Sequence, residues 1–331
     1  MASCKKCGKV AKEIAEVLSL CAGCIRQADA SCLAAIEEIH ARSRSEFSLP
    51  ARPPAGPEGI KCGLCVNQCC IPAGARGYCG VHKNEDGRLK GGGPEGAVVS
   101  WYHDPLPTNC VADWVCAGGT GAGYPAWAYR SGPERSHVNL AAFYEACTFD
   151  CLFCQNWHYR QRSLSDQTRS APELADAVTA QTSCICFFGG DPTPQLPHAL
   201  DASKLARQQN DPRILRICWE TNGSMAPGLL DEMINLSLDS GGEVLQGAEP
   251  PPLVASTLLV PGYIDAREVG DIATFIARQN PNIPYALLGF HGDFLMTDLP
   301  PTSRKQAEMC LTAAKKAGLK RVRIGNIHIL S

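Results

Sequence analysis

Residues 145–160 read EACTFDCLFCQNWHYR, in which Cys147, Cys151 and Cys154 are separated by three and then two residues. Three thiolates on one loop can hold three irons of a cubane iron–sulfur cluster. No fourth cysteine is supplied locally, so one iron would stay open and could bind another molecule. The alternatives for this spacing are a zinc knuckle or chance, but structural zinc prefers a closed set of four ligands.

The sequence after residue 136 alternates between short apolar runs and helical patterns. Helical patterns cover residues 171–181, 266–278 and 303–317, where Thr302 or Ser303 would cap the last helix. Such alternation predicts an α/β fold with a parallel sheet covered by helices, and functional residues of parallel α/β barrels gather where strands end. The apolar runs are 137–143, 184–190, 214–220, 253–260, 285–290 and 320–326.

Composition excludes several classes of protein. Of 331 residues, 45% are hydrophobic and 19% charged, which is typical of a globular chain, and a net charge of −2 argues against nucleic-acid binding. No apolar run is long enough to span a membrane, and the N-terminus lacks the apolar core of a signal peptide. We therefore expect a cytoplasmic protein whose 19 cysteines are reduced and ligate metals rather than form disulfides.

Three successive strand ends carry turns that could approach a ligand. Glycine lets the backbone come close to a bound molecule, although each turn alone would more often be an ordinary strand-end turn. The turns are Gly189, Gly190, Asp191 and Pro192; then Glu220, Thr221 and Asn222 before Gly223; then Val260, Pro261 and Gly262.

The cysteine loop, with Phe153 before its third cysteine, and the three turns in this order resemble the radical S-adenosylmethionine (SAM) superfamily. Within it they resemble activating enzymes related to pyruvate formate-lyase activase. Segments 61–89, 287–302 and 318–330 are similar to an uncharacterised branch of that group, whereas residues 1–50 lie outside the resemblance.

The resemblance implies a partial (β/α)6-type barrel in which the three cysteines hold a [4Fe–4S] cluster and the three turns cradle SAM. Asp191 stands where the superfamily usually has Glu. The implied reaction is reductive cleavage of SAM to a 5′-deoxyadenosyl radical, which abstracts a hydrogen atom. By analogy, the partners are a flavodoxin- or ferredoxin-like one-electron donor and a protein substrate.

One departure from the relatives concerns residues 224–259. Relatives carry another strand there with an Asp-x-Lys type motif, whereas here a helix at 227–239 is followed by residues 243–246 as at most a shortened strand. The barrel is therefore predicted to lack or shorten one βα unit, with Asp239 as a solvated helix end. This departure motivates the alternative function, a non-catalytic iron–sulfur and zinc-binding protein derived from this fold.

The N-terminal segment, residues 1–47, carries a separate four-cysteine pattern followed by a helix at about 28–47. The pattern has the spacing of a zinc ribbon or rubredoxin-like knuckle. Four thiolates close a tetrahedral site, so zinc is favoured, with a single iron or no metal as alternatives. Its members are Cys4, Cys7, Cys21 and Cys24.

Residues 48–61 are rich in Pro and Gly and are predicted to be a linker. Residues 62–136 form a second segment, in which 83–136 are expected to be a loop-rich wrap before the radical SAM core at 137–331. A structural zinc and an auxiliary iron–sulfur cluster are equally compatible with its cysteines. These are Cys62, Cys65, Cys69 and Cys79, with Cys70 as a possible substitute.

The remaining candidates carry weaker signals. His291 ends the fifth apolar run, where a histidine could face substrate, and it is the catalytic candidate. Cys110 and Cys116 could be ligands or loop thiols. Three cysteines in apolar runs are interpreted as small buried residues: Cys184, Cys186 and Cys218.

Overall fold

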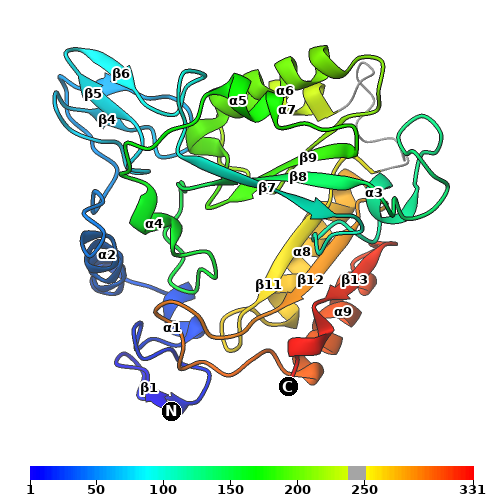
Figure 1. The fold of residues 1–331 in the computed structure, drawn as a ribbon. Helices are drawn as coiled ribbons and strands as arrows, with labels where there is room; N and C mark the ends of the chain where they lie inside the picture. Colours follow the sequence, from blue (N-terminus) through cyan, green and yellow to red (C-terminus); the bar gives the residue numbers. More distant parts are fainter. Residues whose placement is uncertain (238–250) are drawn as a thin grey trace.

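The computed structural model describes residues 1–237 and 251–331, which form a mixed α/β structure (Figure 1). Two sheets with helices against them make up the larger part, and the cysteine-rich N-terminal segments pack beside one side of the sheets. No described helix has the length and apolar character needed to cross a membrane.

The first sheet has four strands in the order β10-β9-β8-β7. Strands β8, β9 and β10 are parallel, and β7 is antiparallel to β8. The sequence VSWYHDP of β7 has no apolar alternation, so it was expected to be part of a loop, and its pairing with β8 makes it a strand. The bounds are β7 Val99–Pro105, β8 Val138–Tyr144, β9 Thr182–Gly189 and β10 Arg216–Trp219.

The second sheet has three parallel strands in the order β11-β12-β13. In the described part of the chain no strand pairing joins it to the first sheet. The predicted short strand at 243–246 and Asp239 lie outside the described residues. The bounds are β11 Ala255–Leu259, β12 Tyr285–Gly289 and β13 Val322–Gly325.

Five longer helices cover the sheets. The helix predicted at 303–317 is confirmed, because Ser303 caps it by accepting a hydrogen bond from the Gln306 amide. The helix predicted from residue 171 ends at Asp176, earlier than expected, and α6 was not predicted. The bounds are α5 Ala171–Asp176, α6 Leu196–Asn210, α7 Pro227–Ser237, α8 Ala266–Gln279 and α9 Arg304–Lys316.

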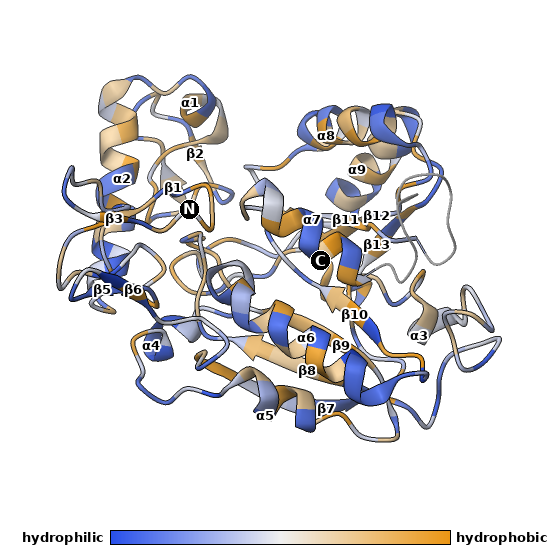
Figure 2. Cartoon of the chain, turned by 90° about the horizontal axis from the view of Figure 1, so that it is seen from above, coloured by the Kyte–Doolittle hydropathy of each residue, from blue (hydrophilic) through white to orange (hydrophobic). Residues whose placement is uncertain are grey.

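Helices α5, α6 and α7 pack on one face of the first sheet. Alternate strand residues such as Leu140, Ile185 and Ile217 form a core with them. Figure 2 shows the apolar strands β8 and β9 beside helices whose other sides are hydrophilic. The opposite face of β8–β10, here called the inner face, carries the alternate residues Asn139, Ala141, Cys184, Cys186, Arg216 and Cys218.

Helices α8 and α9 cover the second sheet in the same way. Their core includes Leu259, Tyr285 and Leu287 from the strands and Val269 and Cys310 from the helices. Leu258 of β11, next to Leu259 in the chain, packs instead against a third apolar cluster that includes Leu152 and Phe290. The face of the second sheet away from α8 and α9 thus meets loops and the N-terminal segment.

The N-terminal segments contain short elements only, apart from α2, which Asp29 caps by accepting a hydrogen bond from the Cys32 amide. Three pairs of short strands are antiparallel: β1 with β2, β3 with β4, and β5 with β6. The bounds are β1 Ala2–Ser3, β2 Val10–Ala11, α1 Ala22–Arg26, α2 Ala30–Ser45, β3 Ile60–Lys61, β4 Cys70–Ile71, β5 Lys83–Glu85 and β6 Arg88–Lys90.

Tyr263, just after β11, attaches the first of these segments to the second sheet. Its hydroxyl accepts a hydrogen bond from the Ala15 amide and donates one to the Leu20 carbonyl, both at 3.0 Å. Arg26 adds an ion pair to Glu268 at 2.9 Å. The N-terminal segment is thus attached to the second sheet by contacts between residues about 250 positions apart.

The loop from 106 to 137, which contains α3 (Ala117–Thr120), is attached to both sheets. Arg216 of β10 donates to both carboxylate oxygens of Glu134, at 2.9 and 2.6 Å, and both residues are buried. Arg323 of β13 donates to Asp113 at 2.8 Å. The two ion pairs hold one loop across the inner face.

We predict that Glu134→Ala lowers the free energy of unfolding by about 3–5 kcal/mol, because it leaves the buried Arg216 guanidinium without its counter-charge. Urea unfolding followed by circular dichroism under anaerobic conditions measures this. Glu95→Ala, at an exposed position, should change the value by less than about 0.5 kcal/mol. Equal losses in the two variants would contradict the prediction.

Candidate functional site

Cys147, Cys151 and Cys154 lie on the loop between β8 and α4 (Tyr159–Arg162), and all three are partly buried. Burial raises the pKa of each thiol, and the nearby Cys154 contributes to raising the pKa of Cys151 to about 11. At least two of these sulfurs are more than 4.8 Å apart, because the triad is not among the described groups whose ligand atoms all lie within that distance. The spacing therefore fits a cluster of several metal atoms better than one ion.

Asp150 anchors the cysteine loop through ion pairs. Its carboxylate is buried and pairs with Arg160 at 3.0 Å, with Arg44 of α2 at 3.7 Å and with His40 of α2 at 2.9 Å. Although burial opposes ionisation, the His40 hydrogen bond and the two arginine charges together lower the pKa of Asp150. The loop is thus fixed to α2 by charged residues that the cysteine motif does not reveal.

Gly189 and Gly190 hold the start of the cysteine loop. A methyl group on Gly189 would lie 2.7 Å from the Tyr144 backbone, and one on Gly190 would overlap the Ala146 carbonyl oxygen. Because both positions are glycine, the backbones can approach closely. The Gly190 amide donates to the Tyr144 carbonyl at 2.9 Å, and the Asp191 amide donates to the Ala146 carbonyl at 2.7 Å. These glycines permit a close approach of backbone to backbone, rather than only of backbone to ligand.

Asp191 joins three strand ends. Its buried carboxylate accepts hydrogen bonds from the hydroxyls of Thr221 at 2.7 Å, Thr193 at 3.2 Å and Thr148 at 3.3 Å. Burial raises the pKa of Asp191. Because Thr148 lies between the first two cysteines and Thr221 follows β10, the carboxylate ties the cysteine loop to the two neighbouring turns.

Asn222 also reaches the cysteine loop. Its side-chain amide donates to the Thr148 hydroxyl at 2.8 Å and lies 3.8 Å from the Cys147 sulfur. Glu220, two residues earlier, is partly buried near Cys110, and burial raises the pKa of Glu220. The turns after β9 and β10 therefore meet at the cysteine loop, and Pro192 caps the short 3-10 helix Thr193–Gln195. Their role in holding SAM stays a prediction.

The third turn meets the loop through apolar contacts. Val260 and Phe290 share a core with Leu152, which lies between the second and third cysteines. Gly262, in contrast, has a φ of 78°, and a methyl group there would overlap the Glu13 carbonyl oxygen. Pro261 is buried between them, so this turn contacts both the loop and the N-terminal segment.

His291 follows β12 and is partly buried, with its Nδ1 atom 3.3 Å from the Gly292 carbonyl. The residues after it approach the loop more closely. The Leu295 amide donates to the Leu152 carbonyl at 2.9 Å, and Phe294 stacks on Trp157. The role of His291 as a catalytic residue stays a prediction.

Comparison with known proteins agrees with this arrangement. Residues 142–242 match the model of the Radical SAM superfamily, a range that includes the three cysteines and the first two turns. The chain contains a radical SAM domain. Such a domain implies a [4Fe–4S] cluster and SAM, and supports a radical SAM enzyme in general.

An uncharacterized protein of Methanocaldococcus jannaschii is similar to most of the chain outside this domain as well. The alignment has 25% identity over a length of 293, and it covers 81% of this chain and 81% of that protein. The radical SAM domain itself fits the implied cluster, since its cysteine loop supplies three partly buried thiols with an amide and several hydroxyls around them.

A four-cysteine group lies apart from the radical SAM domain, near the N-terminus. All four sulfurs lie within 4.8 Å of one another, and those of Cys7 and Cys21 are 3.8 Å apart. Zinc–sulfur bonds of about 2.3 Å in a tetrahedron place sulfurs roughly 3.8 Å apart, so the group fits one tetrahedral ion. Its members are Cys4, Cys7, Cys21 and Cys24, as the sequence predicted.

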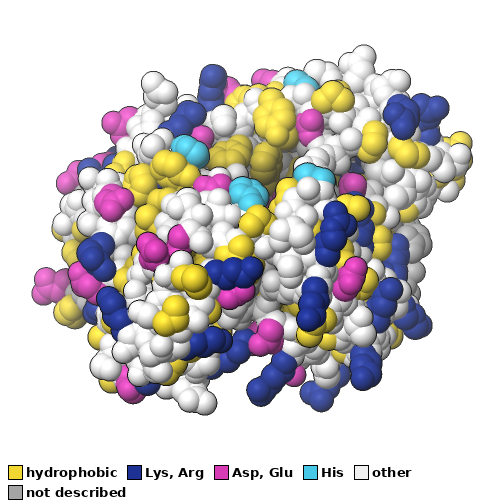
Figure 3. Space-filling view, turned by 90° about the horizontal axis from the view of Figure 1, so that it is seen from below, with side chains coloured by type: hydrophobic (Ala, Val, Ile, Leu, Met, Phe, Trp, Pro, Cys, Tyr) yellow, Lys and Arg dark blue, Asp and Glu magenta, His cyan; other side chains and the backbone are white. Residues whose placement is uncertain are grey.

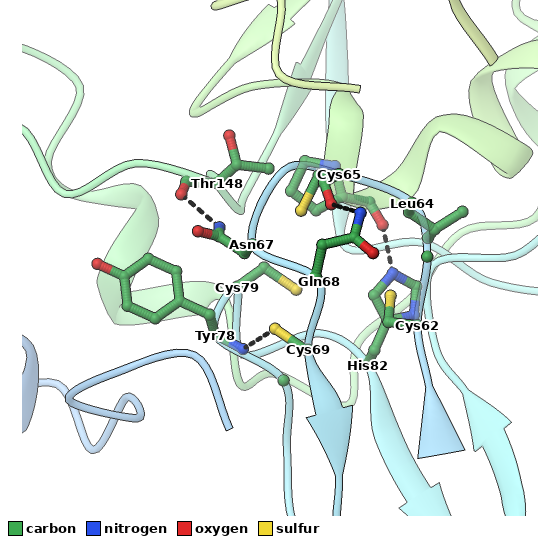
Figure 4. A pocket seen from close by; sticks show the side chains of 13 residues that line it. Cys62, Leu64, Cys65, Asn67, Gln68, Cys69, Tyr78, Cys79, His82 and Thr148 are labelled. Atoms are coloured by element: carbon green, nitrogen blue, oxygen red, sulfur yellow. Dashed lines mark hydrogen bonds between the residues drawn. The ribbon is translucent and has the colours of Figure 1, made fainter. Parts of the chain in front are cut away.

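A second group lines a pocket beside the radical SAM domain: Cys62, Cys65, Cys69 and Cys79 (Figure 4). In contrast to the first group, these sulfurs do not all lie within 4.8 Å of one another. The Cys70 thiol instead donates to the Gly56 carbonyl at 2.7 Å and is not among the residues lining the pocket.

This pocket adjoins the cysteine loop of the radical SAM domain. The Asn67 side chain donates to the Thr148 carbonyl at 2.8 Å, and the Val66 amide donates to the Ser224 carbonyl at 2.9 Å. Burial raises the pKa of Cys62 to about 12, with Cys79, Cys65 and Cys69 as smaller contributors. Four thiols, one buried and three partly buried, therefore face one space next to the predicted cluster.

Sequence reasoning missed the polar residues that assemble the site. Thr148, Asp150 and Arg160 lie inside or just after the quoted cysteine loop, but nothing in their spacing shows which distant residues they meet. An aspartate between two cysteines, as at Asp150, is a sequence signal that could have suggested a structural network. Charged side chains are rarely buried unless they are paired, and Asp150 is buried.

We predict that Gly190→Ala displaces the loop at Ala146, destabilising the protein by roughly 1–3 kcal/mol and lowering the iron bound after anaerobic reconstitution. Iron analysis and thermal unfolding measure both effects. Gly132→Ala is the control, since a methyl group there meets no atom within 4 Å. Full iron content in Gly190→Ala would show that the close approach does not position the loop.

Proposed function

We propose that the protein is a radical SAM oxidoreductase of the activating-enzyme type, with Cys147, Cys151 and Cys154 as the ligands of its [4Fe–4S] cluster. The observation that carries this is the meeting of the turns after β9 and β10 at one loop, through the Asp191 carboxylate and the Asn222 amide. With three cysteines for four irons, one iron is left for SAM.

When bound, the cluster supplies the electron that cleaves SAM to the 5′-deoxyadenosyl radical. Residues of the chain position and shield the cluster. Asn222 donates toward the Cys147 sulfur, which favours the thiolate, and Thr148 fixes the orientation of the Asn222 side chain. Asp191, which is buried, would lie near the amino group of SAM, and Glu220, which is partly buried, near its carboxylate group. His291 would face the substrate.

The substrate is proposed to be a protein, and the electron donor a flavodoxin- or ferredoxin-like protein. The molecule is hollowed on the face seen from below, where hydrophobic side chains line the hollow and histidines lie near its edge (Figure 3). Concave, mostly apolar surfaces of this kind are typical of ligand-binding sites. The six parallel strands β8–β13 would form the partial barrel around it.

For the second cysteine group we propose an auxiliary iron–sulfur cluster rather than zinc. Its four sulfurs are too widely spaced for one tetrahedral ion, and the pocket they line touches Thr148 of the cluster loop. The proximity would allow electrons to pass to the radical SAM cluster. For Cys4, Cys7, Cys21 and Cys24 we propose one structural zinc.

Anaerobically reconstituted protein, given dithionite and SAM, is expected to form 5′-deoxyadenosine, and Cys151→Ala should form none above background because the cluster loses a ligand. Chromatography of the quenched reaction measures the product. Cys310→Ala, a buried cysteine of the second core, is the matched control and should retain activity.

Calorimetric titration with SAM separates the rival function. If the protein binds SAM but the wild type produces no 5′-deoxyadenosine, the non-catalytic binding protein is the better account. Absence of both binding and cleavage, with the cluster loaded, would overturn the proposed function.

The double substitution Cys7→Ser and Cys21→Ser should release about one zinc per chain and leave the iron content unchanged. Because metal binding folds a segment this small, residues 1–26 should also become sensitive to proteolysis. Elemental analysis and mass spectrometry of the fragments test this. Loss of iron in place of zinc would assign the site to iron.

A further inference from the structure

A third set of cysteines lies on the inner face of the first sheet. Cys218 of β10 is in register with Cys186 of β9, and Arg216 is in register with Cys184. Side chains alternate along a strand, so these three cysteines share the face opposite to the helices, while Ile185 belongs to the core. Cys184 and Cys186 are each only 7% exposed.

The loop 106–137, which crosses this face, supplies two more cysteines. Cys110 and Cys116 are partly buried, and each sulfur accepts a hydrogen bond from a backbone amide: Ala112 to Cys110 at 3.4 Å, and Gly119 to Cys116 at 3.2 Å. The Cys147 sulfur of the radical SAM loop accepts from the amide two residues later in the same way, at 3.4 Å. Amide donors to sulfur stabilise thiolates and tune iron–sulfur clusters.

The loop is held against β9 and β10, the strands that carry the other three cysteines. Glu134 of the loop pairs with Arg216 of β10, and a methyl group on Gly118 would lie 3.3 Å from the Arg216 guanidinium. The two sets of thiols also interact. Burial raises the pKa of Cys186, and Glu220, Cys110 and Cys184 raise it further.

Cys184 and Cys218 lie on the paired strands β9 and β10. Each is the largest influence on the pKa of the other, which lowers the pKa of Cys184 and raises that of Cys218. The Cys184 thiol also lies 3.4 Å from the Asn139 side-chain oxygen. We call the five residues Cys110, Cys116, Cys184, Cys186 and Cys218 the inner-face cysteines.

Packing alone accounts for part of this set, since a buried cysteine behaves as a small hydrophobic residue. It does not account for two further cysteines from a separate loop, with amide donors at their sulfurs, at the same face. Thiolates in such numbers are the ligands that soft metals prefer. Among the described residues only the N-terminal group has its sulfurs all within 4.8 Å, so the inner-face cysteines are too spread for one tetrahedral ion.

We propose that the inner-face cysteines bind an iron–sulfur cluster, distinct from the radical SAM cluster and from the two N-terminal metal groups. Glu220 lies between this site and the cysteine loop, because its carboxylate is beside Cys110 and its turn reaches Thr148 through Asn222. The proposal stands on the positions of five thiols and does not depend on SAM cleavage.

The experiment starts from the full chain with Cys147, Cys151 and Cys154 all changed to Ser, which removes the radical SAM cluster. Iron, sulfide and zinc are counted per chain after anaerobic reconstitution, before and after adding Cys110→Ser and Cys116→Ser. The proposal predicts that these two loop substitutions remove about two or four irons and as many sulfides. Cys310→Ser, added instead, should remove none.

Unchanged iron and sulfide in the folded loop variant would overturn the proposal, as would a loss of zinc alone. Circular dichroism and the unfolding midpoint establish that the variant is folded. If it is not, Cys218→Ser in the same parent takes its place, with the same two outcomes. Because the parent cannot cleave SAM, failure here leaves the proposed function untouched, and failure of the cleavage assay leaves this result untouched.

Discussion

The buried Asp191 carboxylate is the constraint on which the site depends. A carboxylate removed from water is stable only when donors surround it, and here the donors are hydroxyls from the cysteine loop, the turn after β9 and the turn after β10. Meeting that requirement brings Thr148 and Thr221 together. Asn222 then falls beside Cys147, so the geometry of the proposed cluster site follows from satisfying one buried charge.

The N-terminal segments brace the same loop from the other side. Arg44 and His40 of α2 reach Asp150, and Asn67 of the second cysteine group reaches the Thr148 carbonyl. The N-terminal segments that carry the two cysteine groups are thus physically connected to the radical SAM loop. The four-cysteine group at the N-terminus contacts the second sheet through Tyr263, which extends the connection to the far end of the chain.

Local patterns were predictable from the sequence, and contacts between distant residues were not. Features whose signals lie within one segment could be predicted. These are the cysteine spacings at residues 4–24 and 147–154 and the helices α8 and α9. Strand β7 was missed because it forms by pairing with β8. The Asp150 network was missed because two of its partners, His40 and Arg44 on α2, are over a hundred residues away. The interpretation of Cys184, Cys186 and Cys218 as small buried residues agrees with the burial of the first two, while Cys218 is partly buried. Their strand register, which places all three on the inner face, is not visible in the sequence.

The most direct test is electron paramagnetic resonance of the reduced, reconstituted protein with and without SAM. The account predicts a [4Fe–4S]⁺ signal whose g-values change when SAM is added, and no such SAM-dependent change in Cys151→Ala. A cluster signal that is the same with and without SAM in the wild type would contradict the claim that one iron is open to SAM.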